Sequence, residues 1–396
     1  MNVLTAGWRG YLDEKKHVIS VFIDLSKAFD TVNHSLLLKK LYFYNFSHQT
    51  TSLISNYLSN RSSIVKVGES FSKKVSGENF GIPQGSILGP LLFIIFMNDL
   101  PFSKLKSKII LYADDITIYF SSLSIDSVIS NLTQDISTLK TWLDHNHLIL
   151  NLTKTNAFLL THQSFLYNLP SNIHLTIDKF SIPFVRTVKV LGVILDDKLR
   201  FSNHITSVCS QVNSKSHLLR RNSYLFPLSF RITLVKLFIL SRFNYCSSLF
   251  FHEASTVDKT RLNRCYSRSL KKMIGINIST LNVDQQTSVL KEFSLLPLEI
   301  NYFKCFIVFI HSLFRYPIKS QLFDFFVRSQ TRTRSTFIIP TFFTNYGKNS
   351  FITIASKLLN IFLYKHIELS KKKLLIYLSK NIITLHLKAK HIWENG

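Results

Sequence analysis

Two adjacent aspartates, Asp114 and Asp115, stand between two short runs of apolar, β-prone residues. The runs are residues 109–111 and 116–120. Such runs joined by so few polar residues predict a β-hairpin. A turn accommodates one Asp readily, but two neighbouring carboxylates repel each other unless a cation lies beside them. Because hard cations such as Mg²⁺ bind carboxylate oxygens, the hairpin tip is either a solvated turn or a metal site.

A third carboxylate, Asp24, ends another β-prone run, residues 18–24. This run is apolar almost throughout, which is typical of a central strand covered on both faces. If this strand and the hairpin lie side by side in one sheet, three carboxylates converge from separate parts of the chain. Such a cluster suits two divalent ions about 3.5–4 Å apart and predicts phosphoryl or nucleotidyl transfer.

Residues 81–86, Gly-Ile-Pro-Gln-Gly-Ser, form a glycine-rich segment between the two acidic sites. Two Gly and one Pro predict a loop that turns tightly or admits a ligand close to the backbone. Ser86 is the predicted N-cap of an apolar helix over residues 87–100. The loop is either a phosphate cradle or a plain strand-to-helix turn, and it lacks the Gly-Lys-Ser/Thr of a P-loop.

A formal charge of +25, from 48 Lys and Arg against 23 Asp and Glu, predicts a polyanionic partner. Nucleic acid is the first candidate and an anionic membrane surface the second, whereas a codon bias toward Lys, Asn, Ile and Phe is the alternative explanation. Positive charge collects beyond about residue 200, where helical patterns over 203–225, 227–240 and 256–274 replace β runs. We therefore expect a domain boundary near residue 200.

The remaining signals favour an intracellular protein. The four cysteines are widely spaced and show no zinc-binding pattern, which indicates free thiols in a reducing compartment. Neither a signal peptide nor an apolar run of the roughly 20 residues that span a membrane is evident.

Five segments of the sequence, in order, resemble motifs A to E of the reverse transcriptases of LINE-type (non-LTR) retrotransposons, close to the jockey-like groups. They are residues 22–34, residues 81–93 running on to 98–100, residues 112–115, residues 150–155, and residues 190–193 with Asp196 and Asp197. Group II intron maturases share the Tyr-Ala-Asp-Asp box, but residues 24–34 favour the retrotransposon enzymes.

The resemblance implies an α+β fold. A polymerase palm, an antiparallel sheet with helices on one face, would occupy residues 1–200. A basic helical thumb would follow over 201–285 and a helical C-terminal region over 286–396. Because only 23 residues precede Asp24, the fingers are expected to be largely missing and the chain to be an N-terminally truncated copy.

The resemblance also implies catalytic roles. Asp24 and Asp114 would bind two Mg²⁺ ions, or Mn²⁺ in their place, and Asp115 would be a weaker or more distant ligand. Lys154 would donate a proton to the leaving pyrophosphate or offset its charge.

Three further residues would contact substrate. Phe29 would stack under the sugar and exclude a 2′-hydroxyl, and Gln84 and Gly85 would lie against the incoming nucleotide and the template. The expected activity is RNA-directed DNA synthesis, extending a DNA primer on an RNA template with deoxynucleoside triphosphates. The alternative is an inactive remnant that still binds nucleic acid through its basic thumb. The family implies a nuclear location, and the sequence indicates no oligomeric state.

Overall fold

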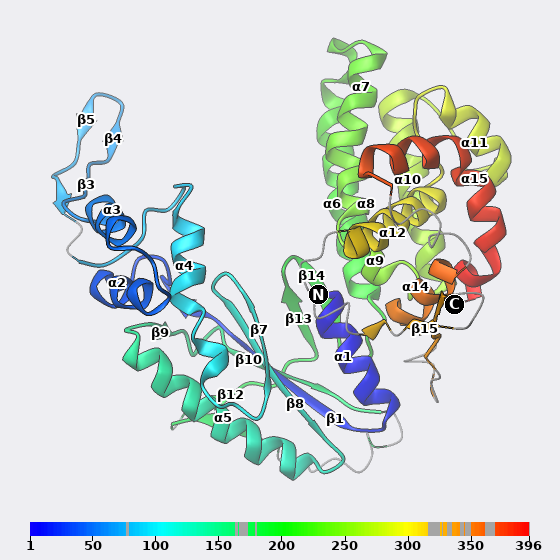
Figure 1. Cartoon of the computed structure of the whole chain (residues 1–396). Helices are drawn as coiled ribbons and strands as arrows, with labels where there is room; N and C mark the ends of the chain where they lie inside the picture. Colours follow the sequence, from blue (N-terminus) through cyan, green and yellow to red (C-terminus); the bar gives the residue numbers. More distant parts are fainter. Residues whose placement is uncertain are drawn as a thin grey trace. The chain divides into compact units, whose positions relative to one another are not determined.

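The computed structural model describes residues 1–76, 79–162, 165, 173–178, 180–315, 325–326, 328–330, 335–340, 344, 350–360 and 369–395. The fold mixes helices and sheet, as the sequence predicts. By its internal contacts the chain divides into two compact units, shown in Figure 1. The sheet unit comprises Lys15–Arg186, and the helical unit comprises Met1–Glu14 together with Thr187–Gly396.

A four-stranded antiparallel sheet lies at the centre of the sheet unit, in the order β10-β1-β8-β7. Its strands are β1 (His17–Ile23), β7 (Lys108–Tyr112), β8 (Asp115–Ser122) and β10 (Asn156–Leu160). On one side of β1, Ile23 faces Ile116 of β8. On the other side, Phe22 faces Asn156 of β10. The predicted central strand and the predicted hairpin are both confirmed.

Helix α5 (Ile125–His145) packs against β1 and β8, and the Ser124 hydroxyl at its start accepts the Ser127 N–H. Its buried residues recur at helical spacing and form one apolar stripe: Leu132, Ile136, Leu139 and Leu143. The stripe shares a core with Ile19, Val21 and Ile23, which are alternate residues of β1. Because alternate strand residues point to one face, α5 covers that face of the sheet.

The other elements of the sheet unit are shorter. They are β2 (Leu25–Ser26), α2 (His34–Phe43), α3 (His48–Leu58), β3 (Ser62–Ser63), β4 (Lys66–Val67), β5 (Ser70–Phe71), β6 (Val75–Ser76), α4 (Gly89–Met97), the 3₁₀ turn η1 (Leu100–Phe102), β9 (Ile149–Leu150), β11 (Leu175–Ile177) and β12 (Phe180–Ile182). Side chains of Asn33 and Ser47 cap α2 and α3, because each accepts a backbone N–H from the first turn.

Helix α4 is shorter than the sequence predicts. It begins at Gly89 rather than at residue 87, and it ends at Met97. The Ser86 hydroxyl still accepts the Gly89 N–H at 3.0 Å, but it also donates to the Pro83 carbonyl at 2.7 Å. Ser86 therefore closes a turn ahead of the helix, and the N-cap position falls on Leu88. The prediction of Ser86 as N-cap was wrong because the loop makes one further turn.

The helical unit consists mostly of α-helices, together with short β-hairpins and short 3₁₀ and π-helical segments. Its elements are α1 (Asn2–Asp13), β13 (Thr187–Val190), β14 (Val193–Asp196), α6 (Ser202–Arg221), the 3₁₀ turn η3 (Ser223–Leu225), α7 (Leu228–Leu234), the π-helical segment η4 (Val235–Leu240), α8 (Ser241–Asn244), α9 (Ser247–Phe250), α10 (Thr256–Ile274), α11 (Val283–Lys291), α12 (Leu298–Arg315), β15 (Arg328–Gln330), β16 (Ser335–Phe337), α14 (Phe351–Leu358) and α15 (Lys371–Asn395). Helix α10 packs on α6 and lies where the sequence predicts.

One prediction in this unit needed correction. Residues 187–196 form the β13–β14 hairpin, which reverses at Leu191 and Gly192 with φ of 47° and 81°. The Tyr245 hydroxyl donates to the Leu191 carbonyl, and the Tyr245 ring lies against Gly192. The helix expected over 227–240 is α7 followed by the π-helical turn η4.

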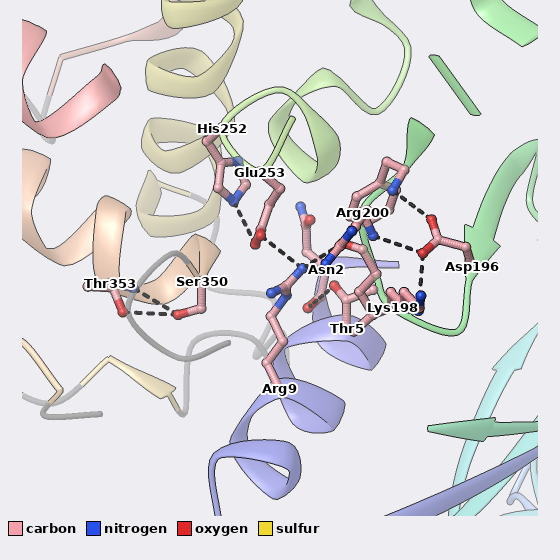
Figure 2. A network of polar contacts seen from close by, with 12 residues as sticks. Asn2, Thr5, Arg9, Asp196, Lys198, Arg200, His252, Glu253, Ser350 and Thr353 are labelled. Carbon is pink, nitrogen blue, oxygen red and sulfur yellow. Dashed lines mark hydrogen bonds and ion pairs between the residues drawn. The ribbon is translucent and has the colours of Figure 1, made fainter. Parts of the chain in front are cut away.

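Helix α1 is held in the helical unit by a buried polar network, shown in Figure 2. Arg9 forms an ion pair with Glu253 at 2.9 Å, and both side chains are more than nine-tenths buried. The same guanidinium donates to the Leu199 carbonyl at 3.2 Å. Asp196 accepts the backbone N–H groups of Lys198, Arg200 and Phe201, which shapes the turn that leads from β14 into α6.

The contact-based units differ in their bounds from the predicted functional domains, 1–200, 201–285 and 286–396, which remain predictions. Part of the last domain, including residues 316–324 and 361–368, lies outside the described residues. In the portion of the chain that is described, no helix is both long enough and apolar enough to cross a membrane.

We expect Asp135→Ala to lower the free energy of unfolding by about 2–4 kcal/mol, because the buried Asp135 carboxylate accepts two backbone N–H groups. They are the N–H groups of Lys106 and Ser107, just before β7, at 3.1 and 2.6 Å. Urea unfolding of the two proteins measures the difference. The matched control is Asp144→Ala in the same helix, where the loss of an exposed pair with Lys140 should change the free energy of unfolding much less. Equal losses in the two variants would contradict this account.

Candidate active site

Asp24 lies just beyond the end of β1, with a carboxylate on one side and an amine on the other. The β1–β8 register places Ile23 opposite Ile116, so Asp24 and Asp115 come next along the two segments. The β1–β10 pairing ends with Phe22 opposite Asn156, two residues after Lys154. Lys154 Nζ is 3.6 Å from Asp24 Oδ2. The pairing of the strands therefore brings the predicted carboxylates and the predicted lysine together at one end of the sheet.

The hairpin tip is a two-residue turn, Ala113 and Asp114, between the paired residues Tyr112 and Asp115. Ala113 has a φ of 53°, a left-handed conformation that costs an L-residue about 1–2 kcal/mol. Asp114 is half-buried and Asp115 is exposed. Strain of this kind tends to persist at functional sites, and here the conformation of Ala113 determines the direction in which the Asp114 side chain points.

The electrostatics of the three carboxylates show how close they are. Although Asp115 is largely exposed, its partial loss of hydration raises its pKa above the usual range, and the negative charges of Asp114 and Asp24 raise it further. The three groups therefore repel one another. Among the described residues, no three Asp, Glu, His or Cys side chains are grouped tightly enough to hold a metal ion as they stand. The donor set, three carboxylates beside one amine, nevertheless fits a hard divalent cation, because a cation would remove this repulsion.

Asn151 is a site residue to which the sequence analysis assigned no role. Its side-chain amide donates to Asp24 Oδ2 at 3.0 Å, and its backbone N–H donates to the Asp24 carbonyl at 2.9 Å. The short pairing of β2 with β9, Leu25 opposite Leu150, places it there. Its position within the 150–155 motif was the available signal, but its contact depends on a strand pairing that the sequence does not reveal.

The glycine-rich loop is hydrogen-bonded to the segment that follows Asp24. The Gly81 and Ile82 N–H groups each donate to that segment at 2.8 Å, to the carbonyls of Val32 and Phe29 respectively. His34 Nε2 lies 2.7 Å from the Gly81 carbonyl. Gly81 has a φ of 89°, and a Cβ there would lie 3.2 Å from the Asp30 carbonyl oxygen. This position needs glycine on both counts.

The three predicted substrate-binding residues lie on or beside this loop. Phe29 is half-buried and stacks on Phe93 of α4, with ring centroids 4.5 Å apart. The exposed Gln84 amide donates to Asp30 Oδ1 at 3.0 Å. Gly85 is exposed, has a φ of 77°, and has open space where a Cβ would be. The loop contacts therefore tie these residues to the segment that carries Asp24, while their roles remain predictions.

Comparisons with known proteins identify sequences that are similar to this chain. Residues 6–195 match the sequence model of the family described as reverse transcriptase (RNA-dependent DNA polymerase). The chain is 30% identical over 218 residues to a probable RNA-directed DNA polymerase from transposon BS of Drosophila melanogaster, covering 52% of this chain and 23% of that protein. It is 28% identical over 211 residues to the RNA-directed DNA polymerase from mobile element jockey of the same fly, covering 52% and 22%.

The chain thus spans about a quarter of the length of these relatives. Among solved structures, apo telomerase from Candida tropicalis aligns over 81% of this chain and 55% of its own, with a TM-score of 0.40 and 10% identity.

We expect Asp115→Asn to raise the melting temperature of the metal-free protein at pH 7 by about 1–3 °C. The folded-state pKa of Asp115 lies above the ordinary value of 3.8, so its ionised form lowers stability above that pKa. The gain should fade as the pH falls through this pKa, because a protonated carboxyl no longer repels its neighbours. Thermal melts from pH 3 to 8 measure it. Asp197→Asn, next to Lys198, should give no rise; a rise from Asp115→Asn that does not depend on pH would refute this electrostatic origin.

Proposed function

We propose that this chain carries the polymerase active site of a LINE-type (non-LTR) retrotransposon enzyme, because residues 6–195 match the sequence model of the reverse transcriptase (RNA-dependent DNA polymerase) family. The proposed reaction extends a DNA primer on an RNA template by nucleotidyl transfer from deoxynucleoside triphosphates. The observation that carries the proposal is the position of Asp24 at the end of β1. The β1–β8 register sets Asp24 beside Asp115, and Lys154 Nζ lies 3.6 Å from the Asp24 carboxylate.

Asp24 and Asp114 would hold two Mg²⁺ or Mn²⁺ ions, with Asp115 as the weaker ligand. Such ions lower the pKa of an attacking hydroxyl and offset the charge of a leaving pyrophosphate. The role of the surrounding residues is to hold these carboxylates in position. Asn151 fixes the carboxylate of Asp24 by its amide, and the strained turn at Ala113 fixes the direction of Asp114.

Lys154 would act as the acid. Its side chain is 69% exposed and lies 3.6 Å from Asp24, so it can move toward a pyrophosphate without breaking a buried contact. A positioned proton donor of this kind contributes about 10²–10⁴-fold to a rate. Phe29, supported by Phe93, would lie under the sugar of the nucleotide, and Gln84 and Gly85 would line its path from the exposed loop.

The sheet unit would then be the palm, and α6 with α10 the thumb. Helix α10 carries exposed cationic side chains at helical spacing along one face: Arg261, Arg264, Arg268 and Lys271. Such a stripe can follow the phosphates of a duplex, and binding through it would depend strongly on salt. This stripe also favours the second candidate function, an inactive remnant that binds nucleic acid, since it does not require the carboxylates.

Primer extension tests the proposal with an RNA template, a DNA primer, deoxynucleoside triphosphates and Mg²⁺. We expect Asp24→Asn and Asp114→Asn each to reduce the rate by about 10³-fold or more, equivalent to about 4 kcal/mol of transition-state stabilisation. Asn151→Ala, which only frees the Asp24 carboxylate, should reduce it about 10–100-fold.

The matched control is Asp144→Asn, which removes the same charge from an exposed site in the same unit and should leave the rate unchanged. Full activity in Asp114→Asn would refute the proposed active site. Salt-dependent duplex binding without extension by the unaltered chain would instead support the inactive remnant.

A further inference from the structure

The turn that joins α6 to α7 exposes an unusual number of large apolar side chains. We call residues 215–230 the α6–α7 tip; in Figure 1 it includes the end of α7 that projects from the helical unit. The 3₁₀ turn η3 at its centre buries none of its residues. Tyr224 is 80% exposed and Leu225 63% exposed, and other apolar side chains lie open around them: Leu218, Leu228 and Phe230. Turns between helices are normally polar, so this exposure needs an explanation.

The tip is also strongly cationic, with no acidic side chain to balance it. No Asp or Glu occurs between residues 198 and 252, a segment that contains eight Lys and Arg. Arg220 and Arg221 are exposed, and neither side chain has an ion pair or hydrogen bond to any described residue. By contrast, Arg231 donates to the Met273 carbonyl at 3.4 Å and has a structural role. Cations in the last turn of α6 suit the helix dipole, which explains their charge but not the aromatic ring beside them.

We propose that the α6–α7 tip binds an unpaired stretch of RNA, in which Tyr224 stacks on a base and Arg220 and Arg221 contact the flanking phosphates. This combination of an open aromatic face and uncompensated cations is how proteins bind single strands with little sequence preference. Proteins typically recognise RNA where its bases are unstacked. The inference rests on the proposed function for the identity of the strand, namely RNA that the enzyme copies, but it concerns a surface outside the carboxylate site.

Single-stranded nucleic acid is favoured over other occupants by the geometry of the turn. A duplex hides its base faces and offers nothing for Tyr224 to stack on, whereas a single strand offers both bases and phosphates. An anionic membrane surface would be bound by an apolar helix face with cations along it. Here the most exposed apolar side chains, Tyr224 and Leu225, lie on a one-turn 3₁₀ element between two helices.

The test measures equilibrium binding of the full chain to a short, labelled, unstructured RNA and to an RNA–DNA duplex of the same length. We expect Tyr224→Ala to weaken single-strand binding about 5–100-fold and to change duplex binding less than about twofold. Tyr224→Phe, which keeps the ring, should bind as the unaltered chain does. The control Tyr42→Ala removes an exposed tyrosine from the sheet unit, where Tyr42 is 52% exposed, and should have no effect.

Salt dependence separates the two parts of the site. Replacing Arg220 and Arg221 together by Gln should lower the slope of log affinity against log salt by about 1.4, since each phosphate contact to a single strand contributes about 0.7. Tyr224→Ala should leave this slope unchanged. Unchanged single-strand affinity in Tyr224→Ala would overturn the proposal. So would a Tyr224→Phe variant as weak as the alanine variant, or a loss confined to binding of anionic vesicles.

Failure of this inference can be told apart from failure of the proposed function. Asp114→Asn should still bind the single-stranded RNA fully, because it does not touch the tip. Tyr224→Ala should still extend a primer at saturating template. Because Tyr224 is mostly exposed, its variants should melt at the temperature of the unaltered chain, and a large drop in that temperature together with loss of duplex binding would count against a local RNA site.

Discussion

The candidate active site depends on one constraint, the antiparallel pairing of β1 with a strand on each side. Ile23 opposite Ile116 and Phe22 opposite Asn156 determine which residues come next at the edge of the sheet. Because side chains alternate along a strand, a shift of one residue in either pairing would turn the buried apolar residues outward. The core formed by Ile19, Val21 and α5 therefore protects the alignment of Asp24 as well as the stability of the unit.

The charges at that edge are only partly balanced by the chain. Three carboxylates lie near one another, and among the described residues Asp24 receives one exposed amine, from Lys154, and one side-chain amide, from Asn151. This leaves the site less stable electrostatically than its surroundings, as the raised pKa of Asp115 shows. By contrast, the buried Asp135 carboxylate of the same unit accepts two backbone N–H groups. This contrast indicates that the arrangement of Asp24, Asp114 and Asp115 does not serve the stability of the fold alone.

The parts of the structure that sequence predicted well are those in which local pattern and packing agree. The stripe on α5, the apolar run of β1 and the β7–β8 hairpin each carry a clear period or turn. The β13–β14 hairpin was missed because its reversal at Leu191 and Gly192 falls inside an apolar run. The sequence analysis gave Asn151 no role because its contact with Asp24 depends on the pairing of β2 with β9. These two strands begin at Leu25 and Ile149, 124 residues apart in the sequence. Contacts of that kind follow from tertiary structure and leave no local trace.

Helix α1 has a consequence for how the molecule assembles during synthesis. It precedes the sheet unit in the sequence, yet Arg9 contacts Leu199, which lies 190 residues later in the chain. The sheet unit, continuous in sequence from Lys15 to Arg186, is in effect an insertion within the helical unit. On a ribosome it can fold while α1 still lacks its partners, because loop closure over long separations comes late. Until Glu253 has been synthesised, the apolar face of α1 around Trp8 lacks the residues that bury it in the folded unit, so it is exposed to aggregation.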